Sequence, residues 1–183
     1  MQMTDDRTIA APPTKVWDAL FDPEVLKACV PGCQELTGNS EDGYEAVVVQ
    51  KVGPVKATFK GQVTMQDVVA GESCTLVGEG KGGAAGFAKG AAQIRLVPDD
   101  AGGTVLHYEV DAKVGGKLAQ LGSRIVDGFA KRMAGEFFTR FKDQVEDPAE
   151  IASAPAEDSV TEHEPAEVEA RAEKKSWFKR VFN

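Results

Sequence analysis

The middle of the chain alternates between apolar and polar residues. Apolar side chains occupy nearly every second position of 56–66, and Leu106, Tyr108 and Val110 do the same in 104–114. A period of two is typical of strands with one dry and one solvent-exposed face, as in an antiparallel sheet. Turn signals rich in Gly, Asn, Asp and Pro divide 34–115 into about six strands.

Helical patterns flank this region. After a short strand over 4–10, Pro12-Pro13 and Asp22-Pro23 predict the starts of two short helices, because proline is tolerated in a first turn. Apolar residues then recur every three or four positions over 118–145, which predicts one long helix. We therefore predict an α+β fold: a curved antiparallel sheet of about seven strands around a long C-terminal helix, with two short helices after the first strand.

Composition and charge exclude several protein classes. No apolar run reaches the length of a spanning helix, and the acidic N-terminus lacks the apolar core of an export signal, so we expect a cytoplasmic protein. Three cysteines fit a reducing compartment. The net charge of −8 argues against nucleic-acid binding.

That charge is unevenly distributed. Residues 1–145 carry a net charge of −3, residues 146–173 carry −9, and residues 174–183 carry +4. We predict a folded domain over 1–145 and a disordered linker over 146–173, because an Ala-, Glu- and Pro-rich segment cannot bury enough surface to fold.

The last ten residues combine cations with aromatic rings. On a helix, Trp177, Phe178, Val181 and Phe182 would share one side, which is typical of a segment that lies in a membrane interface. An acidic, apolar groove on a partner protein is the alternative. The predicted membrane anchor comprises Lys174, Lys175, Trp177, Phe178, Lys179, Arg180, Val181 and Phe182.

Glycines gather in one predicted strand. Gly78, Gly80 and Gly82 alternate with polar residues, so one face of this strand lacks side chains. We predict an apolar pocket between this face and the long helix, the alternative being that a bulky helix residue fills the gap.

Other motifs give weaker signals. Gly78, Gly80 and Gly83 spell the dinucleotide motif G-x-G-x-x-G, but no helix is expected to follow it. Cys29 and Cys33 fit small buried residues better than a zinc or disulfide site, and too few other metal ligands are present. We predict no metal site and no catalytic residues, since His107, the single histidine of 1–145, falls on a polar strand face.

Four segments of the predicted domain carry a family resemblance. They are KACVPGC (27–33), KVGPVKATFKGQVT (51–64), GEGKGGAAGFAKGAA (78–92) and VGGKLAQLGSRIVDG (114–128). Together they resemble the CoxG family of carbon monoxide dehydrogenase, within the START-like (helix-grip, SRPBCC) superfamily. The resemblance implies a helix-grip fold and an accessory role to a molybdenum-containing carbon monoxide dehydrogenase or a related hydroxylase.

Together these features lead to a hypothesis. Such an enzyme must pass electrons to a quinone dissolved in lipid, so the protein would bind a respiratory quinone (menaquinone or ubiquinone) and recruit the enzyme to the inner face of the cytoplasmic membrane. The alternatives are a membrane adaptor with a filled core and a START-like cyclase or hydrolase. The predicted ligand-cavity residues are Phe59, Val63, Gly78, Gly80, Gly82, Phe87, Tyr108, Leu118, Leu121, Ile125, Phe129 and Met133.

Overall fold

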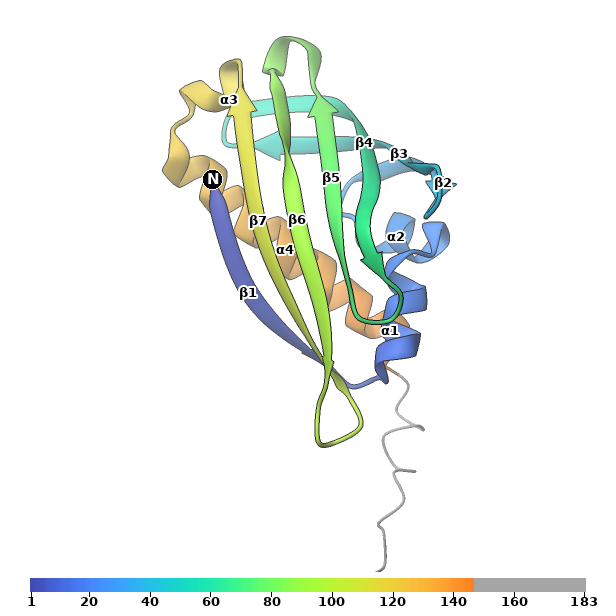
Figure 1. Ribbon diagram of the computed structural model, residues 1–183. Coiled ribbons are helices and arrows are strands. Elements are labelled where there is room, and N and C mark those ends of the chain that lie inside the picture. The colour runs from blue at the N-terminus through green and yellow to red at the C-terminus, as the bar shows by residue number, and fades with distance from the viewer. Residues whose placement is uncertain (147–183) are drawn as a thin grey trace, which may run out of the picture.

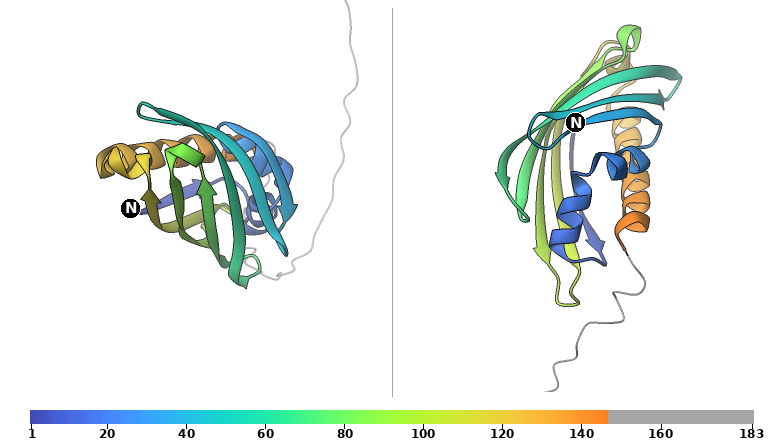
Figure 2. Two further views of the ribbon diagram at one scale, coloured as in Figure 1. Left: turned by 90° about the horizontal axis from the view of Figure 1, so that it is seen from above. Right: turned by 90° about the vertical axis from the view of Figure 1, so that its right-hand side faces the viewer.

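The computed structural model describes residues 1–146 as a single sheet curved around one long helix (Figures 1 and 2). Seven antiparallel strands follow the order β1-β7-β6-β5-β4-β3-β2, so β1 and β2 are the edges. The elements are β1 (Gln2–Ile9), α1 (Pro13–Leu20), α2 (Pro23–Cys29), β2 (Cys33–Asn39), β3 (Gly43–Val52), β4 (Val55–Val69), β5 (Ser73–Lys81), the 3-10 turn η1 (Gly83–Ala85), β6 (Phe87–Pro98), β7 (Thr104–Gly115), α3 (Lys117–Gln120) and α4 (Ser123–Val145).

This arrangement confirms the predicted α+β helix-grip fold. Strands β2 to β7 follow one another as hairpins, and β1 closes the sheet by pairing with β7. As predicted, Pro13 begins α1, and the Asp22 carboxylate caps α2 by accepting from the backbone N–H of Glu24 at 2.8 Å.

Two of the predicted segments, the linker after residue 146 and the tip 174–183, lie outside the described residues. Within 1–146, none of the helices is long and apolar enough to cross a membrane.

The prediction of one continuous helix over 118–145 is wrong in its first turn. Gly122 lies between α3 and α4 with a φ of +85°, which a right-handed helix does not accommodate. The chain therefore turns at Gly122, and the long helix is α4 alone. Its 23 residues span about 34 Å.

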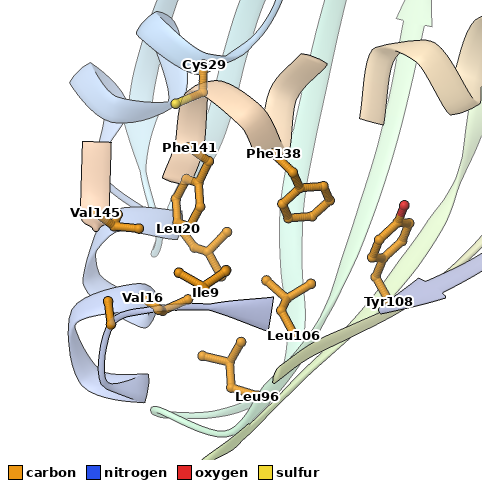
Figure 3. Packing of buried hydrophobic residues seen from close by; sticks show 11 residues of the cluster. Ile9, Val16, Leu20, Cys29, Leu96, Leu106, Tyr108, Phe138, Phe141 and Val145 are labelled. Carbon is orange, nitrogen blue, oxygen red and sulfur yellow. The ribbon is translucent and has the colours of Figure 1, made fainter. Parts of the chain in front are cut away.

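The buried core occupies one end of the molecule, where α1, α2 and the C-terminal half of α4 meet the sheet (Figure 3). Phe141, Ile9 and Leu106 are fully buried there. At the border of this cluster the ring of Tyr108 stacks on Phe138, with centroids 5.3 Å apart. These large side chains fill the space between sheet and helix at this end.

Two hydrogen bonds fasten the ends of the described chain to this core. The buried Thr104 hydroxyl donates to the carbonyl oxygen of Ala11 at 2.7 Å, joining β7 to the start of α1. The backbone N–H of Ala10 donates to the Glu146 carboxylate at 2.9 Å. The chain therefore leaves the domain at the core end, far from α3 and the β5–β6 connection (Figure 1).

Candidate ligand cavity

The inner face of the sheet carries small side chains at the end opposite the core. Gly80 of β5 pairs with Gly61 of β4 on one side and with Ala88 of β6 on the other. Because opposed residues in antiparallel strands point to the same face, these three residues form a strip with almost no side-chain volume. Space is therefore left between this strip and α4.

An apolar cavity of about 260 Å³ occupies that space and is partly open to solvent. Gln50 is the single polar side chain among its lining residues in the described chain. The volume lies just below the roughly 300–1,000 Å³ usual for ligand pockets, so the cavity suits a compact apolar group. Its lining consists of Met1, Val48, Gln50, Val52, Phe59, Gly80, Ala88, Ala112, Val114, Leu118, Val126, Phe129, Ala130 and Met133.

Five of the predicted cavity residues belong to this lining. Gly80 shows the predicted mechanism directly, because a Cβ added there would meet only the Lys60 carbonyl oxygen, at 3.9 Å. The absent side chain thus leaves open volume. The five are Phe59, Gly80, Leu118, Phe129 and Met133.

The other two glycines of β5 and its end do not open the cavity. The Phe59 ring covers Gly82, where an added Cβ would overlap the ring. Val63 lies opposite Gly78, and a Cβ at Gly78 would be 3.1 Å from a Val63 methyl group. The prediction that all three glycines create space is therefore corrected: side chains of β4 fill two of the three positions, and Val63 itself lies beyond the lining.

Two predicted aromatic residues also lie elsewhere. Tyr108 belongs to the core, where its hydroxyl donates to the Asp5 carboxylate at 3.5 Å. Phe87 is 43% exposed on the outer face, because β6 begins at this residue and its alternation places Ala88 inside. The sequence did not reveal this phase, since the glycines and alanines around η1 mask the start of the strand.

Leu121 and Ile125 lie beside the β3–β4 turn at Gly53 instead of in the cavity, and Ile125 is 42% exposed. The reason is helical phase: a step of four residues overshoots a full turn by about 40°. Counted back from the buried Phe141, Ile125 is displaced by about 160°, whereas Val126 is displaced by only about 60°. Val126 accordingly lines the cavity with 7% exposure.

Sequence reasoning missed the contribution of β3. Val48, Gln50 and Val52 point inward, with Val48 directly opposite Phe59. The continuous apolar run 47–49 hides the alternation, although Phe59 on the partner strand would have fixed it had the pairing been known. The inward residues Ala112 and Val114 were visible as alternating positions of 104–114 but gave no sign of a cavity.

Polar chemistry at the cavity is minimal. Gln50 donates from its side-chain amide to the Pro31 carbonyl oxygen at 2.5 Å, which fixes its orientation. Within residues 1–146 no group of three or more His, Cys, Asp or Glu side chains could hold a metal ion. The cavity is therefore built to enclose an apolar group, with Gln50 as the one lining side chain able to hydrogen-bond it.

The remaining motifs lie away from the cavity. His107 is on the outer face, with its Nδ1 atom 2.5 Å from the Asp6 carboxylate. Gly78 and Gly80 belong to β5, and Gly83 begins a three-residue 3-10 turn. No α-helix N-terminus therefore follows the glycine motif, as dinucleotide binding would require.

The cysteines are free and protonated. Cys29 and Cys74 are buried and Cys33 is partly buried. Burial raises the pKa of all three thiols, that of Cys74 to about 11. Because the thiolate is the reactive form, none of these cysteines is activated as a nucleophile.

Cys74 should make stability fall in alkaline solution. The folded protein keeps this 3% exposed thiol protonated to about pH 11, whereas the unfolded chain ionises near 9.0. The contribution is thus complete below pH 9.0 and declines above it, by about 2–3 kcal/mol at the end of the window. Urea unfolding of wild type and Cys74→Val from neutral pH to pH 11 measures it, and equal slopes for the two proteins would contradict the assignment.

A family comparison identifies the chain. Residues 6–146 match the model of the carbon monoxide dehydrogenase family CoxG. The chain belongs to the CoxG family. The match runs from β1 to the end of α4, and so includes every element that builds the cavity. CoxG is an accessory family linked to carbon monoxide dehydrogenase, which confirms the resemblance seen in the sequence.

Solved structures share the CoxG fold. A conserved protein from Geobacillus kaustophilus is 29% identical with a TM-score of 0.74, over 79% of this chain and 95% of its own. Proteins from Chromobacterium violaceum (18% identity, TM-score 0.59, 80% and 98% covered) and Thermus thermophilus (15%, 0.60, 84% and 100%) show the fold alone. No curated protein matches the chain.

Proposed function

We propose that this CoxG-family protein binds the ring of a lipid quinone in the cavity and delivers it to a carbon monoxide dehydrogenase-type molybdenum hydroxylase at the membrane. The cavity is the observation that carries the proposal. Thirteen of its fourteen lining residues are apolar or glycine, and its position between sheet and α4 separates it from the core that holds the fold together. An apolar ring gains free energy by leaving water for such a site.

The volume limits what can be enclosed. About 260 Å³ accommodates a quinone ring but not a long isoprenoid chain. The chain of the quinone would therefore extend outward through the open side of the cavity. A ligand held in this way can pass between a bilayer and an enzyme without leaving its tail fully enclosed.

Family and sequence supply the other parts of the proposal. The CoxG family links the protein to carbon monoxide dehydrogenase. The basic-aromatic tip 174–183 would attach the protein to the inner face of the cytoplasmic membrane, where quinones reside. Cations and aromatic rings together support interfacial binding, and ten residues are too few to span the bilayer.

Extraction of bound lipid tests the proposal. We expect the full chain, purified without detergent from its native host, to release about one quinone per protein molecule into organic solvent, as an apolar cavity of this kind holds one ring. Mass spectrometry of the extract gives the identity and stoichiometry. Recovery of no quinone, or of phospholipid alone, would contradict the proposal.

The small volume favours a second candidate, a membrane adaptor that binds no ligand. It shares the tip and the enzyme partner with the first proposal but assigns no role to the cavity. A protein that recruits the dehydrogenase to membranes while its extract contains no quinone would fit this candidate.

A further inference from the structure

Lysines face one another across the outer surface of the sheet at the cavity end. The pairing places Lys60 of β4 directly opposite Lys81 of β5, and Lys89 of β6 directly opposite Lys113 of β7. A third pair stands at the β3–β4 hairpin. The lysine surface comprises the exposed residues Lys51, Lys56, Lys60, Lys81, Lys89 and Lys113.

These pairs oppose folding. Like charges directly opposite one another in a sheet are destabilising, and here three such pairs lie near the same end. Glu79 offsets part of the charge, since its carboxylate lies 2.8 Å from the Lys81 amine. Glu45 is the other acid in the two cross-strand rows that hold Lys60 and Lys89, and its carboxylate accepts from the Gln62 amide at 2.9 Å. The surface therefore remains positive in a protein whose net charge is −8.

The pKa of Glu79 reports the same local field. A hydrogen bond and the charge of Lys81 lower this pKa, and the charge of Lys89 lowers it further. The lysines thus favour a negative charge placed among them.

The lysine surface and the cavity are two sides of one wall. Along each strand the side chains alternate, so Lys81 lies outside next to Gly80 inside, and Lys89 lies outside next to Ala88 inside. Phe87 pairs with Lys81 and leaves 43% of its surface exposed among the lysines. An apolar ring surrounded by cations, next to an open apolar cavity, matches the boundary between lipid headgroups and acyl chains.

The residue types favour lipid over protein as the partner. All six cations are lysines, a residue depleted at protein–protein interfaces, where arginine is enriched. Lysines near an anionic leaflet, by contrast, add binding free energy one by one. We propose that the lysine surface binds anionic lipid headgroups and holds the cavity end of the domain against the bilayer. This inference rests on the proposed membrane role, but not on the identity of the ligand.

Vesicle binding of the full chain tests the inference. The variant Lys60→Gln/Lys81→Gln/Lys89→Gln/Lys113→Gln removes four of the cations. The matched control is Lys27→Gln/Arg124→Gln/Lys131→Gln/Lys142→Gln, which lowers the net charge equally at other sites. We measure cosedimentation with vesicles of phosphatidylcholine alone and of phosphatidylcholine mixed with phosphatidylglycerol, at low and high salt.

We expect the lysine-surface variant to bind the anionic vesicles about tenfold or more weakly than the wild type, and the control to change about twofold or less. The difference between them should shrink at high salt, because salt screens exposed charges. Thermal unfolding checks folding, and the variant should melt no lower than the wild type since its like-charge pairs are gone. The double variant Lys89→Gln/Lys113→Gln serves as a milder second test.

Equal binding of the variant and its control would overturn the inference. So would a variant that keeps full vesicle binding but no longer captures the dehydrogenase, because the surface would then be a protein site. A chain ending at residue 173 separates the tip from the surface: it should retain weak binding to anionic vesicles that the four substitutions abolish. If quinone extraction fails while the lysine effect appears, the ligand proposal is wrong and this inference stands.

Discussion

Replacing Gly80 by leucine is expected to abolish ligand binding without unfolding the domain. The new side chain would point into the cavity of about 260 Å³, where an added Cβ meets nothing closer than 3.9 Å. Four carbon atoms would then occupy the volume proposed for the quinone ring. We expect the quinone recovered from the purified variant to fall about tenfold or more, equivalent to at least about 1.4 kcal/mol of binding free energy.

Gly128→Leu is the matched control. Gly128 is exposed on α4, and nothing lies within 4 Å of a Cβ added there, so the same substitution leaves the cavity unchanged. It should retain the wild-type amount of quinone. If Gly80→Leu also retains it, the cavity is not the binding site. If Gly80→Leu lacks quinone yet still delivers electrons from the dehydrogenase at the wild-type rate, the adaptor candidate replaces the carrier.

Phe141→Ala should cost about 3–5 kcal/mol of the free energy of unfolding. The Phe141 side chain is fully buried in the core and its ring lies 5.8 Å from that of Phe137. Removing it leaves a void that the surrounding β1, α1 and α2 side chains cannot fill without moving. Urea unfolding followed by circular dichroism measures the change.

Phe129→Ala provides the comparison at the other end of α4. Phe129 is partly exposed and already borders the cavity, so its removal deletes fewer contacts, and we expect about half the cost or less. Equal losses for the two variants would contradict the division of the domain into a packed core end and an open cavity end.

The fold could be predicted because its signals are periodic and local. Alternation over 56–66 and 104–114 fixes strands with one dry face, and Asp22-Pro23 marks a helix start whatever the tertiary structure. The order of the elements then leaves few ways to bury the long helix. The break at Gly122 escaped this reasoning, because apolar residues on both sides of it continue the helical spacing.

The cavity was harder to predict because it depends on which side chains meet across strands. Gly80 and Gly82 look alike in the sequence, yet Phe59 covers only Gly82. The outward position of Phe87 follows from where β6 starts, which the small residues around η1 do not reveal. A spacing of four residues likewise reads as one stripe, although on a helix it drifts far enough to carry Ile125 to the surface.

The open edge of the sheet at β1 has a consequence for how molecules of this protein meet one another. Asp5 and Arg7 of this strand form an ion pair of 2.6 Å, and the Arg7 guanidinium lies over the Phe138 ring, 5.5 Å from its centroid. A strand from another molecule that extended the sheet here would have to desolvate these charges. Inward-pointing charge of this kind is a known protection against edge-to-edge aggregation. The domain can therefore leave one side of its sheet unclosed around a cavity without becoming a template for fibrils.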